Sequence, residues 1–302
     1  MAFAFVPDQD VVEQAKRIAI EQIRQTMDEL RDRSVKRSEK IHHARRDCKK
    51  LRGLLRLVRG GLGGAFKEQD RWLRDSAREL SELRDAKTIF DAYVSLVGAK
   101  HASNRWKDAD PILLLLNRRR RKRGRNKRLV DQQLKVLSGR LAVAESFVGE
   151  WSFEKTGFSL FESGLVDTYQ RAARAMKLAR ESESSEGYHD WRKQVKYHGH
   201  HCQLLVNVWP EMMSARASEV ERLGSLLGDE HDLTVLSQTL SELSEEEGSD
   251  YLRQALAWAG ESQDGLRRAV HPLGSRLFAE RAKRFSGRCG KYWDAASEIG
   301  GK

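Results

Sequence analysis

The sequence is poor in proline, cysteine and long apolar runs, and each shortage removes a class of structure. Only four of its 302 residues are proline, so long helices can run without interruption. The three cysteines, Cys48, Cys202 and Cys289, form no CxxC pair, which disfavours a disulfide framework or a zinc site and favours buried thiols in a reducing compartment. The longest apolar run, 112–116, is too short to cross a membrane, and no signal peptide is recognisable. We therefore expect a soluble, cytoplasmic protein.

Charge is what the chain has in abundance. Charged residues make up 33% of it and hydrophobic residues 39%, which suits helices with one apolar face and a wide charged face. No period-two alternation indicates a strand, so the predicted fold class is all-α. The formal net charge of +11 predicts attraction to polyanions, such as nucleic acid, acidic lipid or a phosphate polymer.

The two halves of the chain resemble each other. A shift of 147 residues places His42 on His189, and it also superimposes charged and apolar residues over a gapless stretch of about fifty positions. Further pairs under this shift are Arg45 with Arg192, Arg46 with Lys193, Lys49 with Lys196, Leu57 with Leu204, Leu80 with Leu227 and Asp85 with Asp232. This indicates an internal duplication, with repeats at about 8–150 and 155–300 inside one domain spanning 1–302.

Apolar periodicity and helix-end signals place the helices of both repeats. In the first repeat we predict helices at 9–33, 37–59, 67–98, 109–122 and 126–149. In the second repeat we predict them at 158–182, 186–208, 211–245, 249–261 and 265–297.

The helix after residue 37 carries an apolar seam and a basic stripe. The seam follows steps of three and four residues: Ile41, Ala44, Cys48, Leu51, Leu55 and Val58. The stripe lies one residue further along with the same steps: His42, Arg45, Lys49, Arg52, Arg56 and Arg59. Because successive residues turn by about 100°, the stripe flanks the buried seam.

Two interpretations of the stripe remain open. Carboxylates such as Glu82 and Asp85 could neutralise it, or it could face an anion. The second repeat favours the anion, since it repeats the start of the stripe and the two stripes can share one concave surface. Other cations also follow helical steps. The candidate anion-binding residues are His42, Arg45, Arg46, Lys49, Lys50, Arg52, Arg56, Arg118, Arg121, His189, Arg192, Lys193, Lys196, His200, Arg284 and Arg288.

The histidines do not form a recognisable metal motif. His198, His200 and His201 are close in sequence, but neighbours one or two positions apart point to different faces of a helix. No HExxH motif is present. We expect no metal site and no cofactor, and we expect Asp232 and His231 to be structural.

The paired histidine motifs resemble the CHAD domain, the conserved histidine α-helical domain. H42-x-x-R45-x-x-x-K49-K50-L51-R52, followed by L83-R84-D85, is similar to its first half, and H189-x-x-R192-K193-x-x-K196, followed by the segment 226–232, is similar to its second. The resemblance implies two pseudo-twofold-related bundles of duplicated four-helix units with a basic central surface. It also implies binding of inorganic polyphosphate and association with polyphosphate granules.

This chain resembles a stand-alone member, because the ExExK signature of a CYTH domain is absent. It departs from the family where 197–200 reads YHGH in place of further arginines, so the second half is expected to bind more weakly or with more pH dependence.

The leading function predicted from the sequence is non-catalytic polyphosphate binding, with other polyanions as further partners and no membrane. The alternative is nucleic-acid binding, which the basic run 118–123 supports. Aromatic stacking platforms are almost absent from the stripes, which favours a ligand without bases. A phosphohydrolase or a histidine phosphoacceptor is a third hypothesis. We expect no enzyme, because the carboxylates show no cluster that could hold metal ions.

Overall fold

The computed structural model describes residues 3–80, 85–100, 110–123, 127–247 and 250–300. Within these ranges the fold is all-α, as predicted, with twelve helices, one 3₁₀ turn and no strand. The helices are α1 (Val11–Arg31), α2 (Arg37–Leu57), α3 (Arg59–Leu62), α4 (Ala65–Glu79), α5 (Asp85–Gly98), α6 (Pro111–Arg123), α7 (Lys127–Gly149), α8 (Ser159–Ser182), α9 (Ser185–Leu204), α10 (Pro210–Glu247), α11 (Asp250–Leu277) and α12 (Ala282–Gly300); the 3₁₀ turn η2 is Val206–Val208.

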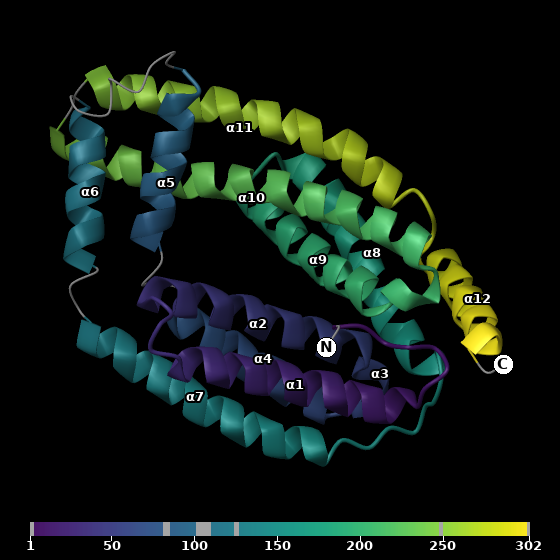
Figure 1. The fold of residues 1–302 in the computed structure, drawn as a ribbon. Coiled ribbons are helices and arrows are strands. Elements are labelled where there is room, and N and C mark those ends of the chain that lie inside the picture. The colour runs from purple at the N-terminus through teal and green to yellow at the C-terminus, as the bar shows by residue number, and fades with distance from the viewer. Residues whose placement is uncertain (1–2, 81–84, 101–109, 124–126, 248–249, 301–302) are drawn as a thin grey trace.

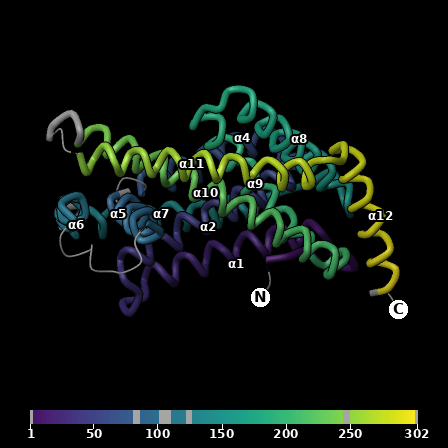
Figure 2. The backbone as a smooth tube through the Cα atoms, turned by 90° about the horizontal axis from the view of Figure 1, so that it is seen from above, coloured from purple at the N-terminus to yellow at the C-terminus, as the bar shows by residue number. Residues whose placement is uncertain are grey.

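The helices are arranged in a ring (Figure 1). α1, α2, α4 and α7 form one side, and α8 to α12 form the other, with α10 and α11 running side by side in both views (Figures 1 and 2). α5 and α6 span the two sides at one end, and α2 contacts α9 nearer the middle. No helix in the described ranges is long and apolar enough to span a bilayer.

Two hydrophobic cores hold this ring together. The larger one joins α1, α2, α4 and α7 to α8, α9, α12 and the adjoining parts of α10 and α11. The smaller one joins α5 and α6 to the far halves of α10 and α11, through residues such as Tyr93, Ile112, Leu236 and Leu252. Each core therefore takes helices from both predicted repeats, so the two repeats pack against each other through both cores.

Helix α2 lies at the centre of the larger core. Its predicted seam is confirmed, since Ile41, Cys48 and Leu55 are all buried. Asp47 and Leu54, which lie off that seam, are also fully buried. Burial on more than one side follows from contacts with α1, α4 and α7 and also with α8 and α9. The stripe cations of α2 are therefore only partly exposed.

The crossing of α2 and α9 depends on one glycine. A Cβ atom on Gly53 would lie 2.7 Å from Cβ of His200, so only glycine fits without a shift. The backbone carbonyl of Gly53 also lies 3.1 Å from Nε2 of His201. Gly53 and His200 correspond to each other under the shift of 147 residues. Contact between equivalent positions is what a twofold axis passing between α2 and α9 would produce.

Several predicted helix boundaries were wrong. The predicted helix 67–98 is two helices, α4 and α5, because α5 leaves the line of α4 to pair with α6 and to pack on α10. The predicted break at 262–264 does not exist, and α11 continues to Leu277 with Pro272 inside it. The break lies instead at 278–281, within the predicted helix 265–297, and α12 begins at Ala282. The predicted helix 186–208 ends at Leu204 and continues as the 3₁₀ turn. Glu82 and the side chain of Asp85, the expected partners of the stripe, lie outside the described residues.

Candidate anion-binding cleft

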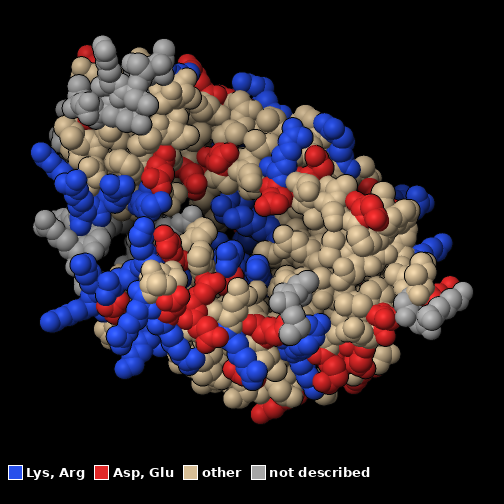
Figure 3. Space-filling view, viewed as in Figure 1, with Lys and Arg blue, Asp and Glu red and all other residues tan. Residues whose placement is uncertain are grey.

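A cleft of about 510 Å³ opens between α2, α9, α10 and the start of α5. We call it the central cleft. Its walls carry cations from both repeats: Arg45, Arg46 and Lys49 from α2, and Arg192 and Lys196 from α9. Figure 3 shows Lys and Arg side chains lying in and beside a hollow near the middle of this face. The structure thus brings together the first part of both predicted stripes.

The cations of the two walls correspond under the duplication. Arg45 pairs with Arg192, and Lys49 pairs with Lys196. Nη1 of Arg45 donates a hydrogen bond to the Leu80 carbonyl oxygen at 3.4 Å. The Arg192 guanidinium lies over Gly228, where a Cβ would come within 3.5 Å of Nε and Nη2. Leu80, which follows α4, and Gly228 of α10 are nearly equivalent under the shift of 147 residues, so the two guanidinium groups lie beside nearly equivalent points of the backbone.

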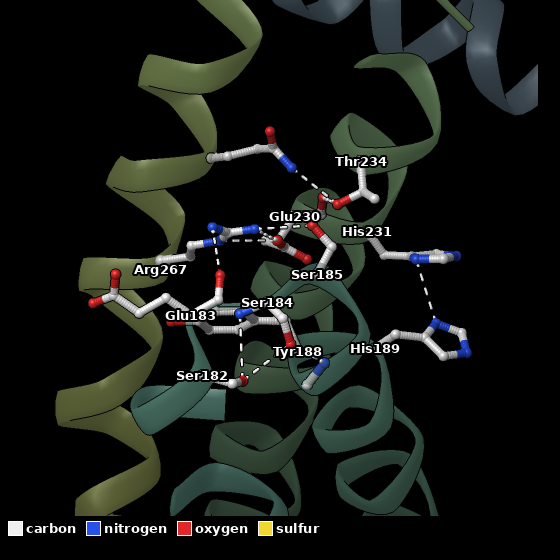
Figure 4. Close-up of polar contacts among 12 residues, drawn as sticks. Ser182, Glu183, Ser184, Ser185, Tyr188, His189, Glu230, His231, Thr234 and Arg267 are labelled. Atoms are coloured by element: carbon white, nitrogen blue, oxygen red, sulfur yellow. Dashed lines mark hydrogen bonds and ion pairs between the residues drawn. The ribbon is translucent and has the colours of Figure 1, made fainter. Parts of the chain in front are cut away.

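Histidines line the same cleft, and cations from both walls affect the pKa of one of them. His231 on α10 lies in the cleft, and its Nδ1 is 3.3 Å from Nδ1 of His189 on α9 (Figure 4). The pKa of His231 is lowered to about 4, first by burial, next by His189, and then by Arg192, Lys196 and Lys49. Because cations from both α2 and α9 act on this imidazole, they share one local field.

His200 behaves in the same way on the other side of the cleft. Its half-buried ring has a pKa lowered to about 4, chiefly by burial. A hydrogen bond with Gln203 opposes this shift, whereas Lys50, Lys196 and Lys49 reinforce it. His42, at the start of the first stripe, also lines the cleft. At neutral pH the imidazoles of His200 and His231 are therefore uncharged.

The central cleft also contains carboxylates that the sequence analysis did not assign to it. Glu221, Asp229 and Asp232 of α10 line it, against five Lys and Arg side chains. Burial raises the pKa of Asp229, while the nearby Arg192 lowers it. The missed signal is helical spacing, since Glu221, Ser225, Gly228 and Asp232 follow steps of 4, 3 and 4 on one face of α10. Asp232 and His231, expected to be structural, both face the cleft.

The far end of the first stripe does not reach the cleft. Arg52 donates from Nε to Oδ1 of Asp70 at 2.9 Å, and Arg56 donates from Nη2 to Oδ2 of the same carboxylate at 3.0 Å. Burial alone would raise the pKa of Asp70, but these hydrogen bonds outweigh it, so the pKa lies below its usual value. Arg56 also stacks on Tyr197, with Cζ 4.2 Å from the ring centroid. Asp70 thus pairs with both arginines, and because neither of them lines the cleft, we leave Arg52 and Arg56 out of the site.

The other candidates outside the cleft lining have different surroundings. Lys193 forms an ion pair with Asp190, Arg288 forms one with Glu280, and Lys50 lies over the ring of Phe3. Arg118 and Arg121 are exposed on α6, and Arg284 is exposed on α12. His189 reaches the cleft only through its contact with His231.

The buried histidines serve packing. His201 lies against the Gly53 carbonyl, and the His198 ring packs among Tyr169, Phe278 and Phe285. Over the described part of the chain, no group of three or more His, Cys, Asp or Glu side chains is placed to hold a metal ion. The three cysteines are free and buried, as predicted.

Comparison with known families places the chain in one of them. A family model for the CHAD domain matches residues 17–241. The chain belongs to the CHAD domain family. A search of curated proteins found no match. The CHAD match runs from α1 into α10 and so contains every residue that lines the central cleft. The CHAD family is associated in general with polyphosphate binding.

Proposed function

We propose that this CHAD protein binds inorganic polyphosphate in the central cleft, without catalysing a reaction on it. The observation that carries the proposal is the presence of equivalent cations, Arg45 with Arg192 and Lys49 with Lys196, on the two walls of one cleft. Family membership supports the ligand class. In cells we expect the protein in the cytoplasm, in association with polyphosphate granules.

The residue types suit a phosphate chain. The planar guanidinium groups of Arg45 and Arg192 offer paired hydrogen bonds to phosphate oxygens, and Lys49 and Lys196 supply mobile point charges. Arg45 and Lys49 are four residues apart, which is about 6 Å along α2. Successive phosphates of a linear chain can therefore meet cations on both walls. Partial burial strengthens these interactions relative to bulk water.

Nucleic acid is the less favoured ligand. Single-stranded nucleic acid is usually held by stacking of its bases on aromatic side chains. The described lining of the central cleft includes no Phe, Tyr or Trp. The basic run 118–123, which suggested nucleic-acid binding, begins on α6 outside the cleft. The cleft, with cations and no aromatic side chains in its described lining, therefore suits a ligand that consists only of phosphate groups.

The carboxylates of the cleft support binding without catalysis. Phosphoanhydride hydrolysis normally needs metal ions clamped between carboxylates. Glu221, Asp229 and Asp232 all come from α10, and Asp229 is close enough to Arg192 for the arginine to lower its pKa. We expect no release of phosphate from polyphosphate in the presence of Mg²⁺ or Mn²⁺. Measurable release would contradict the non-catalytic part of the proposal.

The binding proposal is tested by charge reversal on both walls. The variant Lys49→Glu/Lys196→Glu should lower polyphosphate affinity by more than about tenfold, because a charge-assisted hydrogen bond contributes about 1.5–3 kcal/mol. The matched control, Arg118→Glu/Arg121→Glu, makes the same change in net charge on the exposed face of α6 and should stay within about threefold of wild type. Calorimetric titration measures both affinities, and circular dichroism checks helicity.

Equal losses in the two variants would show that only net charge matters, and unchanged affinity in the cleft variant would remove the cleft from the site. A competition experiment separates the ligands. Polyphosphate should displace a short oligonucleotide from the wild-type protein, and failure to do so would favour the nucleic-acid alternative.

A further inference from the structure

A second basic hollow lies on the other side of α2 from the central cleft. It has a volume of about 670 Å³ and is formed by the end of α1, the turn into α2, the first turn of α2 and one face of α7. We call it the outer hollow. Its rim carries Arg31, Arg33, Lys36, Arg37, Lys40 and Lys135. Figure 3 shows a dense group of Lys and Arg side chains at the corner of the molecule where Figure 1 places the start of α7.

Part of this charge is used within the fold. Arg37 donates from Nε to Oδ1 of Asp131 at 2.6 Å, which ties the start of α2 to α7. Nζ of Lys40 donates to the Leu30 carbonyl oxygen at 2.7 Å, which closes the turn between α1 and α2. These contacts join the three elements that form the hollow.

The other cations of the hollow include three with no such contact within the fold. Among the described residues, Arg33, Lys36 and Lys135 form no ion pair and donate no side-chain hydrogen bond that the structure shows. Asp131 is the one described carboxylate that lines the hollow, and Arg37 already holds it. Three cations from a turn, a helix start and a neighbouring helix thus face one concavity without a counterion of their own.

The surroundings favour a multivalent anion. Like charges gathered in a hollow repel one another, and an anion relieves that repulsion. The pKa of Asp131 lies below its ordinary value, chiefly because of its hydrogen bonds with Arg37, with Lys40 and Lys127 adding to the effect. The hydroxyl groups of Ser34 and Ser138 also line the hollow and can donate to phosphate oxygens. Lys36, at the N-cap of α2, makes no side-chain capping bond, so the positive end of that helix adds to the field.

We propose that the outer hollow is a second polyanion site, which takes the part of a long polyphosphate chain that extends beyond the central cleft. The proposal rests on the cleft being the primary site. Helix α2 links the two sites, because Arg37 begins it and Arg45, eight residues later, lines the cleft about 12 Å further along its axis. A chain that leaves the cleft past His42 reaches the start of α2 and meets Lys36 there.

This arrangement predicts a dependence on chain length. Tripolyphosphate is short enough to be held in the cleft alone, whereas a long chain engages both sites. The variant Arg33→Gln/Lys36→Gln/Lys135→Gln should therefore lower the affinity for long-chain polyphosphate by about tenfold and leave that for tripolyphosphate unchanged. For the long chain, the slope of log affinity against log salt concentration should also become shallower by about two. Each phosphate contact in single-stranded nucleic acid contributes about 0.7 to this slope, and the variant removes three such contacts.

A matched control makes the same change in net charge at the far end of the molecule. Arg174, Arg281 and Lys283 are exposed on α8 and around the start of α12, and they also form no ion pair that the structure shows among its described residues. Their triple replacement by Gln should leave the affinity for the long chain within about twofold of wild type. Titration calorimetry of the full chain with both ligands, at several salt concentrations, gives all the affinities and slopes.

The outcomes separate this proposal from the proposed function. Loss of long-chain affinity in the outer-hollow variant alone supports the second site. An equal loss in the control, an equal loss for tripolyphosphate, or no loss at all would overturn it. If the cleft variant Lys49→Glu/Lys196→Glu binds both ligands as wild type does, the cleft proposal fails. In that case the outer-hollow variant shows whether the hollow binds polyanions by itself.

Discussion

The ion pair between Arg267 and Glu230 holds the cleft face of α10 in place, and its removal should be costly. Oε1 of Glu230 accepts hydrogen bonds from Nη2 and Nε of Arg267 at 2.8 and 3.1 Å (Figure 4). Nη1 of Arg267 donates to the Glu183 carbonyl oxygen, and Nη2 also donates to Oγ of Ser185. Arg267 therefore ties α11 to α10 and to the turn between α8 and α9. Glu230 directly precedes the cleft residue His231.

The variant Arg267→Leu leaves the Glu230 carboxyl group buried, with only 1% of its side chain exposed. An uncompensated buried charge costs about 3–5 kcal/mol of unfolding free energy. Protonation of Glu230 would remove the buried charge, at a similar cost. That cost is about 3.4 kcal/mol at pH 7, because the ordinary pKa of 4.5 lies about 2.5 units below this pH. We therefore expect the variant to be about 3–5 kcal/mol less stable than wild type at pH 7.

The stability deficit of Arg267→Leu should also depend on pH. Burial raises the pKa of Glu230 in the folded protein, and the hydrogen bonds from Arg267 oppose that rise, so the pKa should rise further in the variant. Between the unfolded pKa and the raised folded pKa, the native state binds the extra proton, and stability falls as pH increases. The stability deficit of Arg267→Leu should thus shrink by up to about 2.7 kcal/mol from pH 7 to pH 5.

Urea denaturation followed by circular dichroism at pH 5, 6 and 7 measures this deficit. The matched control is Arg253→Leu, which removes a pair with Asp250 whose side chains are 73% and 87% exposed, and it should cost less than about 1 kcal/mol. Adding Glu230→Gln to Arg267→Leu should abolish the pH dependence of the deficit. A deficit below about 1 kcal/mol at pH 7, or the same deficit at pH 5 and pH 7, would refute the reasoning.

Two further predictions concern the cleft and the crossing of α2 and α9. Because burial holds the pKa of His200 and His231 near 4, a bound polyanion should raise both values, so binding should take up protons and strengthen as pH falls from about 8 to 6. Calorimetry in two buffers of different ionisation enthalpy counts the protons, and His200→Gln/His231→Gln should remove this uptake; an unchanged count would contradict the prediction. Gly53→Val should lower the free energy of unfolding by about 1–3 kcal/mol in urea titrations, because the added Cβ meets His200. The control Gly224→Ala places its Cβ at an ordinary contact distance and should be tolerated. Equal effects of the two variants would contradict the packing argument.

Much of the fold could be predicted because helical periodicity is a local signal. The seam of α2 and the shift that relates the repeats are visible in the sequence, and the seam is buried as expected. The break between α4 and α5 could not be predicted, since the equivalent segment of the second repeat continues as one helix, α10. Tertiary packing causes the break between α4 and α5, because α5 must reach α6 and α11 to form the smaller core.

The site could be predicted only in part, for a similar reason. Spacing identified Arg45, Lys49, Arg192 and Lys196 as residues on one face of each helix, but it does not show which distant carboxylate approaches that face. Asp70 is 18 residues from Arg52 and pairs with it through a contact between α4 and α2. The packing of the two repeats against each other decides where each stripe points, and that is a property of the whole fold.

The most direct test of the account is a crystal structure of the protein in complex with polyphosphate. We predict an ordered phosphate chain in the central cleft, with oxygens within hydrogen-bond distance of Lys49 on α2 and Lys196 on α9. A chain ordered elsewhere on the molecule, with these two lysines contacting no phosphate, would contradict it.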